Sequence, residues 1–175
     1  MSVSIRLAAE RDAAALSAFA AAAFRDAFGP HNTPANMDRY VAASFSAERQ
    51  AAEIVDPTGV VLLAEAGSEL AGYVRLVRGG PPKTVAPATV AAPAIEIRRL
   101  YVDRRRHGAG VAQMLMDATM DVARHEGFRS IWLAVWQRNA RAIRFYEKSG
   151  FVRVGTTVFL LGDDEQTDWL MARAV

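Results

Sequence analysis

Two glycines stand beside basic side chains in the segment RRHGAG, residues 105–110. A glycine turn that leads into a helix offers free backbone N–H groups at the positive end of the helix dipole, and such a site binds anions. Gly108 and Gly110 also remove the Cβ atoms that would keep a phosphate at a distance. The segment lacks the GK[ST] sequence of a Walker A loop, and Gln113 occupies the third small position of the dinucleotide fingerprint. The pattern therefore predicts a site for the pyrophosphate of another cofactor, unless the turn only joins a strand to a helix.

Composition excludes several classes of chemistry. The 175 residues include no cysteine, which excludes disulfides and thiolate catalysis, and the three histidines are too scattered to predict a zinc site. The 21 basic and 19 acidic residues give a net charge of only +2, whereas a polyanion-binding protein normally carries a basic stripe. Charged residues interrupt the alanine-rich start, which predicts a soluble helix and neither a signal peptide nor a membrane span. We expect a single domain over residues 1–175, without a metal, in a reducing cytoplasm.

The RRHGAG segment needs a strand before it and a helix after it, and the sequence supplies both. Alternating residues predict a strand over 94–102, and apolar residues at helical spacing predict a helix from Val111 to the EGF sequence at 126–128. A near-continuous apolar strand follows at 130–136, and Asn139 is the expected N-cap of the next helix. The other expected elements are strands at 2–7, 60–66, 69–77, 152–162 and 167–174, helices at 11–28, 34–45, 47–54 and 140–150, an extended loop at 78–94 and a final turn at 163–166.

This strand, glycine turn and helix resemble the acetyl-CoA pyrophosphate loop of the GNAT superfamily of N-acetyltransferases. RRHGAG has the R-x-x-G-x-G pattern, LYV at 100–102 precedes it as in that family, and NARAIRFYEKSGF at 139–151 resembles the family's other hallmark. The segments are correctly ordered and spaced, and the resemblance extends over the whole chain. It implies an α/β, GNAT-like single domain with a mixed, largely antiparallel central sheet, flanking helices and a V-shaped splay between two strands that admits acetyl-CoA.

The resemblance also assigns cofactor-binding roles. Leu100, Tyr101 and Val102 would offer backbone groups to the pantetheine and a donor to the thioester carbonyl. Asn139 matches the position whose side chain touches the cofactor arm. The residues that would wrap the pyrophosphate are Arg105, Arg106, His107, Gly108, Ala109, Gly110, Val111 and Ala112.

Acetyl transfer from a thioester requires a neutral amine. An alkylamine with a pKa of about 10.4 loses its proton at pH 7 at a cost of about 4.6 kcal/mol. By resemblance, Glu96 occupies the position of the family's frequent general base, although a solvent-facing strand charge is an equal alternative and many members use water chains. Tyr146 matches the phenol that protonates the departing thiolate, with simple aromatic packing as the alternative. No covalent acetyl-enzyme is expected, because no cysteine is present and no histidine neighbours a candidate nucleophile.

The acceptor is predicted from a narrower resemblance and from charge. The LGDDEQTDWLM sequence resembles the bacterial spermidine/spermine acetyltransferases, which favours a polyamine. The acidic residues that would line or rim its site are Glu96, Asp163, Asp164 and Glu165. An amino acid, an aminoglycoside and a protein N-terminus stay open, as does a non-catalytic acyl-CoA-binding or sensing module with no use for Tyr146. Of Trp132 and Trp136, which share a strand face, Trp136 is the better pocket candidate. No nucleic-acid or membrane partner is expected, and both a monomer and a homodimer stay open.

Overall fold

The computed structural model describes residues 2–86 and 89–175, so residues 87 and 88 of the expected loop lie outside the described residues. The chain forms two compact units, each assembled from separate stretches of sequence. Unit 1 consists of Met1–Arg75, Arg99–Leu115 and Leu161–Asp164, and unit 2 consists of Leu76–Arg98, Met116–Leu160 and Glu165–Val175. The expectation of one domain over residues 1–175 stays a prediction.

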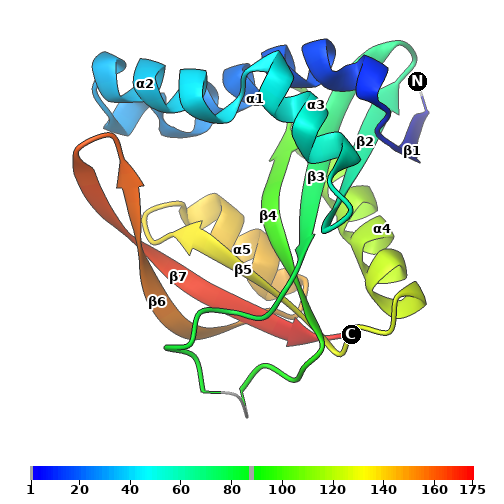
Figure 1. The fold of residues 1–175 in the computed structure, drawn as a ribbon, viewed down its shortest axis with the longest axis vertical. Helices are drawn as coiled ribbons and strands as arrows, with labels where there is room; N and C mark the ends of the chain where they lie inside the picture. Colours follow the sequence, from blue (N-terminus) through cyan, green and yellow to red (C-terminus); the bar gives the residue numbers. More distant parts are fainter. Residues whose placement is uncertain (1, 87–88) are drawn as a thin grey trace. The chain divides into compact units, whose positions relative to one another are not determined.

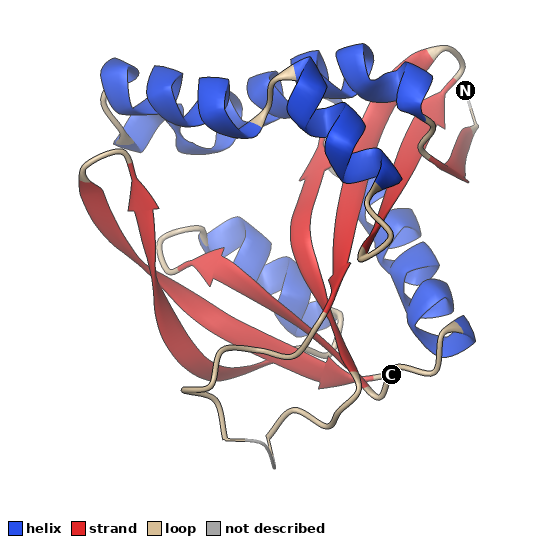
Figure 2. Ribbon diagram, viewed as in Figure 1, coloured by secondary structure: helices blue, strands red, loops and turns tan. Residues whose placement is uncertain are grey.

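Helices and strands both contribute to each unit (Figures 1 and 2). The strands of the described residues are β1 (Val3–Leu7), β2 (Gly59–Ala66), β3 (Glu69–Arg78), β4 (Ala94–Val102), β5 (Ser130–Trp136), β6 (Val152–Leu161) and β7 (Asp164–Ala174). Their α-helices are α1 (Ala13–Phe28), α2 (Pro34–Ser44), α3 (Ala47–Val55), α4 (Val111–His125) and α5 (Ala140–Lys148). Short 3-10 helices cover Glu10–Asp12, Gly29–His31 and Arg104–Arg106. The strands form a sheet in the order β1-β2-β3-β4-β5-β7-β6. No helix of the described residues is long and apolar enough to cross a membrane.

Helices α1, α2 and α3 pack together in unit 1, where α3 also contacts β2 (Figure 1). The sequence determines where two of them begin, because Thr33 and Ser46 accept hydrogen bonds from N–H groups in the first turns of α2 and α3. Phe24 is buried between helices: its ring stacks on Tyr40 with centroids 4.6 Å apart and contacts Phe45 at 5.4 Å. Strand β1 pairs antiparallel with β2. Unit 1 therefore has an aromatic core of its own.

Strand β5 lies between β4 and β7 in unit 2 and carries no charged residue. It pairs in parallel with β4 over Ala94–Ile97, and antiparallel with β7 along Ser130–Trp136. A parallel neighbour requires a crossover connection, which α4 supplies. Val85 and Val90, from the loop after β3, pack in the same buried cluster as Trp132. This loop therefore covers part of one face of the sheet.

The strands predicted at 94–102 and 130–136 match β4 and β5 residue for residue. The α/β class and the mixed, largely antiparallel sheet are confirmed. The turn predicted at 163–166 is wrong, because β7 already begins at Asp164 and only two residues join it to β6. Gln166 is buried inside this strand. The segment therefore shows the alternating burial of a β-strand, which its acidic and polar residue types do not suggest. The V-shaped splay stays a prediction.

Candidate functional site

The RRHGAG segment forms a tight turn in unit 1 between β4 and α4. After the 3-10 helix, the chain passes through Gly108 and Gly110 with φ of +83° and +82°, a region that residues with a Cβ rarely adopt. A Cβ placed on either glycine would meet no atom of the described residues within 4 Å, so the space beside the turn is open. Helix α4 begins directly after it, and the first N–H groups of a helix have no acceptor inside the helix. The turn thus has the features of an anion-binding cradle.

The two arginines of this turn are engaged in ion pairs with neighbouring carboxylates. Nη2 of Arg105 lies 2.6 Å from Oδ2 of Asp103, which also accepts a hydrogen bond from the Arg105 N–H through Oδ1 at 2.9 Å. The bonded guanidinium holds the pKa of Asp103 below its usual value. Arg106 pairs with Glu69 of β3 at 3.2 Å. These pairs hold both guanidinium groups beside carboxylates, and the first backbone N–H groups of α4 remain donors toward an anion.

The segment Leu100–Val102 ends β4 and runs close to β3. A Cβ on Gly72 of β3 would lie 2.8 Å from the carbonyl oxygen of Tyr101, so only glycine permits this approach. A ring nitrogen of His107 lies 3.1 Å from the carbonyl oxygen of Val102, which ties the turn back to the strand. Gly72 was not predicted to matter, although an isolated glycine inside a strand pattern is the usual signal of close backbone approach.

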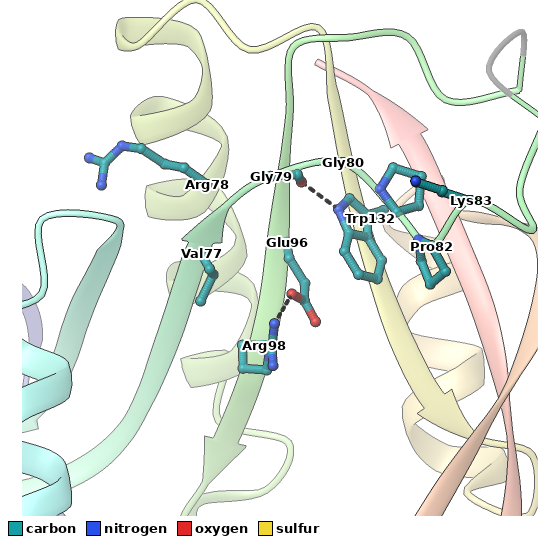
Figure 3. Close-up of a pocket in the computed structure, with 10 residues that line it drawn as sticks. Val77, Arg78, Gly79, Gly80, Pro82, Lys83, Glu96, Arg98 and Trp132 are labelled. Carbon is teal, nitrogen blue, oxygen red and sulfur yellow. Dashed lines mark hydrogen bonds and ion pairs between the residues drawn. The ribbon is translucent and has the colours of Figure 1, made fainter.

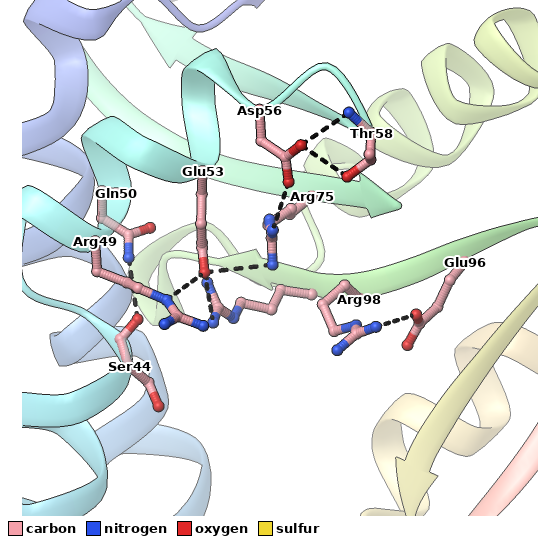
Figure 4. A network of polar contacts seen from close by, with 10 residues as sticks. Ser44, Arg49, Gln50, Glu53, Asp56, Thr58, Arg75, Glu96 and Arg98 are labelled. Atoms are coloured by element: carbon pink, nitrogen blue, oxygen red, sulfur yellow. Dashed lines mark hydrogen bonds and ion pairs between the residues drawn. The ribbon is translucent and has the colours of Figure 1, made fainter. Parts of the chain in front are cut away.

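Glu53 of α3 forms the centre of a polar network in unit 1 (Figure 4). Its carboxylate lies 2.7 Å from Arg99, 3.3 Å from Arg75 and 3.1 Å from Arg49. Glu53 is 6% exposed and the side chains of Arg75 and Arg99 are each 11% exposed, whereas that of Arg49 is 59% exposed. A buried carboxylate therefore links α3, β3 and β4 at the residue before Leu100. The sequence does not reveal this network, because its members come from elements far apart in the chain.

A pocket of about 340 Å³ lies beside β4 in unit 2 (Figure 3). Its walls are Glu96 and Arg98 of β4, Trp132 of β5 and the segment Val77–Lys83. Glu96 is 7% exposed, and its Oε2 accepts a hydrogen bond from Nη2 of Arg98 at 2.6 Å. Trp132 lies opposite Glu96 in the parallel register and donates its indole N–H to the carbonyl oxygen of Gly79 at 2.8 Å. Glu96 is thus a buried carboxylate at a pocket wall and not a solvent-facing strand charge.

Helix α5 carries Tyr146 and begins at Asn139. Tyr146 is 7% exposed, and its ring contacts those of Phe145 and Phe151 at centroid distances of 5.4 Å and 5.7 Å. Burial raises the pKa of its phenol, so the hydroxyl stays protonated at neutral pH. Oδ1 of Asn139 accepts a hydrogen bond from the N–H of Ala142 at 3.1 Å, which confirms the predicted N-cap.

The site residues predicted from the sequence divide between the two units. Unit 1 contains the expected cofactor-binding segments Leu100–Val102 and Arg105–Ala112, and unit 2 contains Glu96, Asn139 and Tyr146. Their contacts with cofactor and acceptor stay predictions. In the part of the chain that the structure describes, no three His, Cys, Asp or Glu residues are grouped so that they could hold a metal ion.

The pocket in unit 2 is lined by Trp132 and not by Trp136, because the segment after β3 folds beside the first of the two rings, and the preference for Trp136 at the acceptor stays a prediction. The hairpin acids are exposed, and Asp163 pairs with Arg39 at 3.2 Å within unit 1. Glu96 is therefore the only buried member of the four acids expected to surround the acceptor.

Comparison with known proteins identifies the family of this chain. The model of the acetyltransferase (GNAT) family matches residues 20–151, which is well over half of the chain. The chain belongs to the GNAT acetyltransferase family. The predicted GNAT fold is confirmed, and the protein is an N-acetyltransferase that uses acetyl-CoA.

Relatives that match the GNAT chain over nearly its full length support this assignment. An uncharacterized N-acetyltransferase of Mycobacterium tuberculosis is 35% identical over 162 residues, covering 93% of this chain and 97% of the relative. Another, of Lactobacillus delbrueckii subsp. lactis, is 29% identical over 174 residues, covering 99% and 98%. Among solved structures, PaiA N-acetyltransferase from Thermoplasma acidophilum in complex with coenzyme A has a TM-score of 0.79 at 21% identity, with 100% of both chains covered. That likeness shows a shared GNAT fold.

Gly110→Val is expected to weaken acetyl-CoA binding about tenfold or more, which corresponds to about 1.4 kcal/mol. A branched side chain would occupy the open space beside the N–H groups and would disfavour the left-handed backbone angle at this position. Calorimetric titration with acetyl-CoA measures the change.

Gly127→Val is the matched control for this substitution. Gly127 also has a positive φ, of +75°, and open space around its Cβ position, but it lies in the turn between α4 and β5. Both variants should lose similar stability, while only Gly110→Val loses affinity. Wild-type affinity in a folded Gly110→Val protein would leave the turn with a purely structural role.

Proposed function

We propose that this N-acetyltransferase transfers the acetyl group of acetyl-CoA directly to a primary amine, with Glu96 as the general base and Tyr146 as the general acid. The observation that carries the proposal is the buried carboxylate of Glu96 at the wall of the pocket in unit 2. The glycine cradle of unit 1 fits the cofactor, because the backbone at Gly108 and Gly110 leaves room for a phosphate. Bound there, acetyl-CoA supplies an acetyl group activated as a thioester.

The acceptor must lose a proton before it can attack. Deprotonation of an alkylammonium costs about 4.6 kcal/mol at pH 7, so a positioned base has a large effect. Glu96 takes this proton through its carboxylate, directly or through one water. Arg98, bonded to Oε2 at 2.6 Å, orients the carboxylate.

The departing thiolate must gain a proton. Tyr146 supplies it from its phenol hydroxyl, which is protonated at neutral pH because a phenol has an ordinary pKa of about 10 and burial raises this pKa further. The rings of Phe145 and Phe151 hold the phenol in one orientation. A sensing module would have no need of this hydroxyl, so the effect of its removal separates an enzyme from a cofactor-binding protein.

A polyamine such as spermidine or spermine is the acceptor we propose. The resemblance of LGDDEQTDWLM to the polyamine acetyltransferases supports it, as does the exposed acidic hairpin formed by Asp163, Asp164 and Glu165. Exposed charges attract a polycation at long range, and this attraction is screened beyond about 8 Å at physiological ionic strength. Added salt should therefore lower kcat/KM for spermidine more than for a monoamine.

An amino acid or peptide N-terminus is the second candidate, and a specific observation favours it. The pocket beside Glu96 is also lined by Arg78, Lys83 and Arg98, of which Arg78 and Arg98 are paired with carboxylates. A cationic wall suits an acceptor that carries a carboxylate. Screening spermidine, propylamine, amino acids and a peptide with acetyl-CoA, while following release of free thiol, decides between the two.

Glu96→Gln is expected to lower kcat/KM for the preferred amine about tenfold or more at pH 7, and to recover part of the loss as rising pH supplies neutral amine. Steady-state rates between pH 7 and pH 9.5 test this. Glu147→Gln, at an exposed carboxylate of α5, should behave as the wild type at every pH. A Glu96→Gln enzyme with the wild-type pH profile would assign proton removal to water alone.

A further inference from the structure

Asp168 of β7 is an acidic side chain that the proposed mechanism does not use. It is 8% exposed, and its Oδ1 has no hydrogen-bond partner among the described residues. Burial without compensating bonds raises the pKa of this carboxyl from 3.8 to about 6, so it is largely ionised at neutral pH. A buried carboxylate without a partner destabilises a protein, and such a group commonly marks a functional site.

The strand register places Asp168 on the same sheet face as Glu96. Asp168 lies opposite Trp136 in the antiparallel pairing of β5 and β7, while Trp132 lies opposite Ala172. Trp132 is in turn the parallel partner of Glu96. Because directly paired residues project to the same side of a sheet, these side chains share one face. Asp168 is four residues along β7 from Ala172, a displacement of about 14 Å at about 3.4 Å per residue.

No cation of the neighbouring elements is bound to Asp168. Strand β5 carries no charged residue, and the charged residue of β6 is Arg153, whose guanidinium stacks over the ring of Trp169 at 4.5 Å. On β7 itself, Arg173 donates to the carbonyl oxygen of Ser149. The described part of the loop that covers this face contributes Lys83, which lines the pocket with Glu96. Asp168 therefore has no ion pair within the described residues, and β5, β6 and β7 supply no countercharge to it.

We propose that Asp168 and Trp136 bind a second, non-reacting ammonium group of a polyamine acceptor. A carboxylate beside an indole offers both an ion pair and a cation–π contact, which together suit an alkylammonium ion. One ammonium group cannot contact both Glu96 and Asp168. Glu96, Trp132 and Ala172 lie side by side across three strands, and Asp168 lies about 14 Å along β7 from Ala172. The group at Asp168 is therefore a different one from the amine that Glu96 deprotonates. This assignment rests on the proposed function of Glu96.

The site explains why a destabilising side chain would be retained. The folded-state pKa of Asp168 lies above its unfolded value, so the folded state binds its proton more tightly and loses stability as pH rises from about 4 to about 6. At pH 7.5 the neutral isostere in Asp168→Asn should therefore leave the thermal midpoint of the free protein unchanged or raise it. A purely structural aspartate would show the opposite.

The kinetic test compares Asp168→Asn with Asp117→Asn, the same chemical change at an exposed position of α4. Asp168→Asn is expected to raise KM for spermidine at least tenfold at pH 7.5 with kcat within twofold, and to leave kcat/KM for propylamine within twofold. Asp117→Asn should match the wild type with both amines. For the wild type, KM for spermidine should fall as pH rises through about 6, because Asp168 ionises while both amines stay protonated; the Asn variant should lack this change.

Three results would overturn the site: an unchanged KM for spermidine, an equal loss with propylamine, or a lowered thermal midpoint of Asp168→Asn. Calorimetric titration of spermidine into both proteins repeats the comparison without turnover. Binding to the wild type alone would support the site even if no amine were acetylated, in which case only the proposed function fails. Equal binding to both proteins, with active acetylation, would reject the site and leave the proposed function intact.

Discussion

Tyr146→Phe should lower kcat about 10²-fold or more while the affinity for acetyl-CoA stays within twofold. The substitution keeps the ring and its contacts with Phe145 and Phe151, and removes only the hydroxyl that would protonate the thiolate. Single-turnover rates at saturating acetyl-CoA, together with calorimetric titration, separate the chemical step from binding.

Tyr73→Phe is the matched control, because Tyr73 is a second buried tyrosine whose phenol pKa is raised by burial. It lies in unit 1 against Phe19 and Tyr101, where no proton transfer is expected. Its kcat should stay within a few fold of the wild type. If Tyr146→Phe also keeps the wild-type rate, the ring serves packing and water protonates the thiolate.

The second large effect concerns stability. Glu53→Gln should reduce the free energy of unfolding by about 3–5 kcal/mol, because the buried Arg99 would lose its anionic partner and the buried Arg75 would keep only Asp56, at 3.9 Å. Arg99 also stacks over the ring of Phe45 at 4.8 Å, so it cannot leave without breaking this contact. Urea denaturation followed by circular dichroism measures the loss.

Arg49→Gln is the comparison for Glu53→Gln. Its side chain is 59% exposed, and an exposed ion pair contributes about 0–1 kcal/mol. A loss as large as that of Glu53→Gln would mean that the surface arginine, and not the buried pairs, holds the network together. A small loss in both variants would show that Arg75 and Arg99 find other partners.

Local signals in the sequence were sufficient for most elements. Strands β4 and β5 begin and end where alternation, apolar runs and flanking turns predict, and the glycine turn leads into α4 at Val111. The start of β7 was not predicted, because a run of charged and polar residues is typical of a turn. A strand, however, needs only every second side chain to face the core. Such local reasoning cannot tell that Gln166 and Asp168 are buried, because their burial depends on neighbouring chain segments.

The candidate site also combines features that local sequence signals predict with features that depend on distant segments of the chain. The cradle glycines and the Asn139 cap could be predicted, because a turn and a helix start are local features, whereas the role predicted for Glu96 came from the resemblance to the family. The pairing of Glu96 with Arg98 follows from two residues on one strand face, which alternation already implied. The pocket beside Trp132 could not be predicted, because it depends on how the segment after β3 folds back over the sheet.

The ion pairs of the glycine turn affect the thermodynamics of cofactor binding. Arg105 is bonded to Asp103, Arg106 to Glu69, and His107 to the carbonyl oxygen of Val102, all within unit 1. Ordering a loop on binding reduces affinity through lost conformational entropy, and a loop that folding has already ordered avoids that loss. If the turn binds pyrophosphate as proposed, these contacts reduce the entropy lost on binding, and each largely exposed pair contributes about 0–1 kcal/mol to that preorganisation.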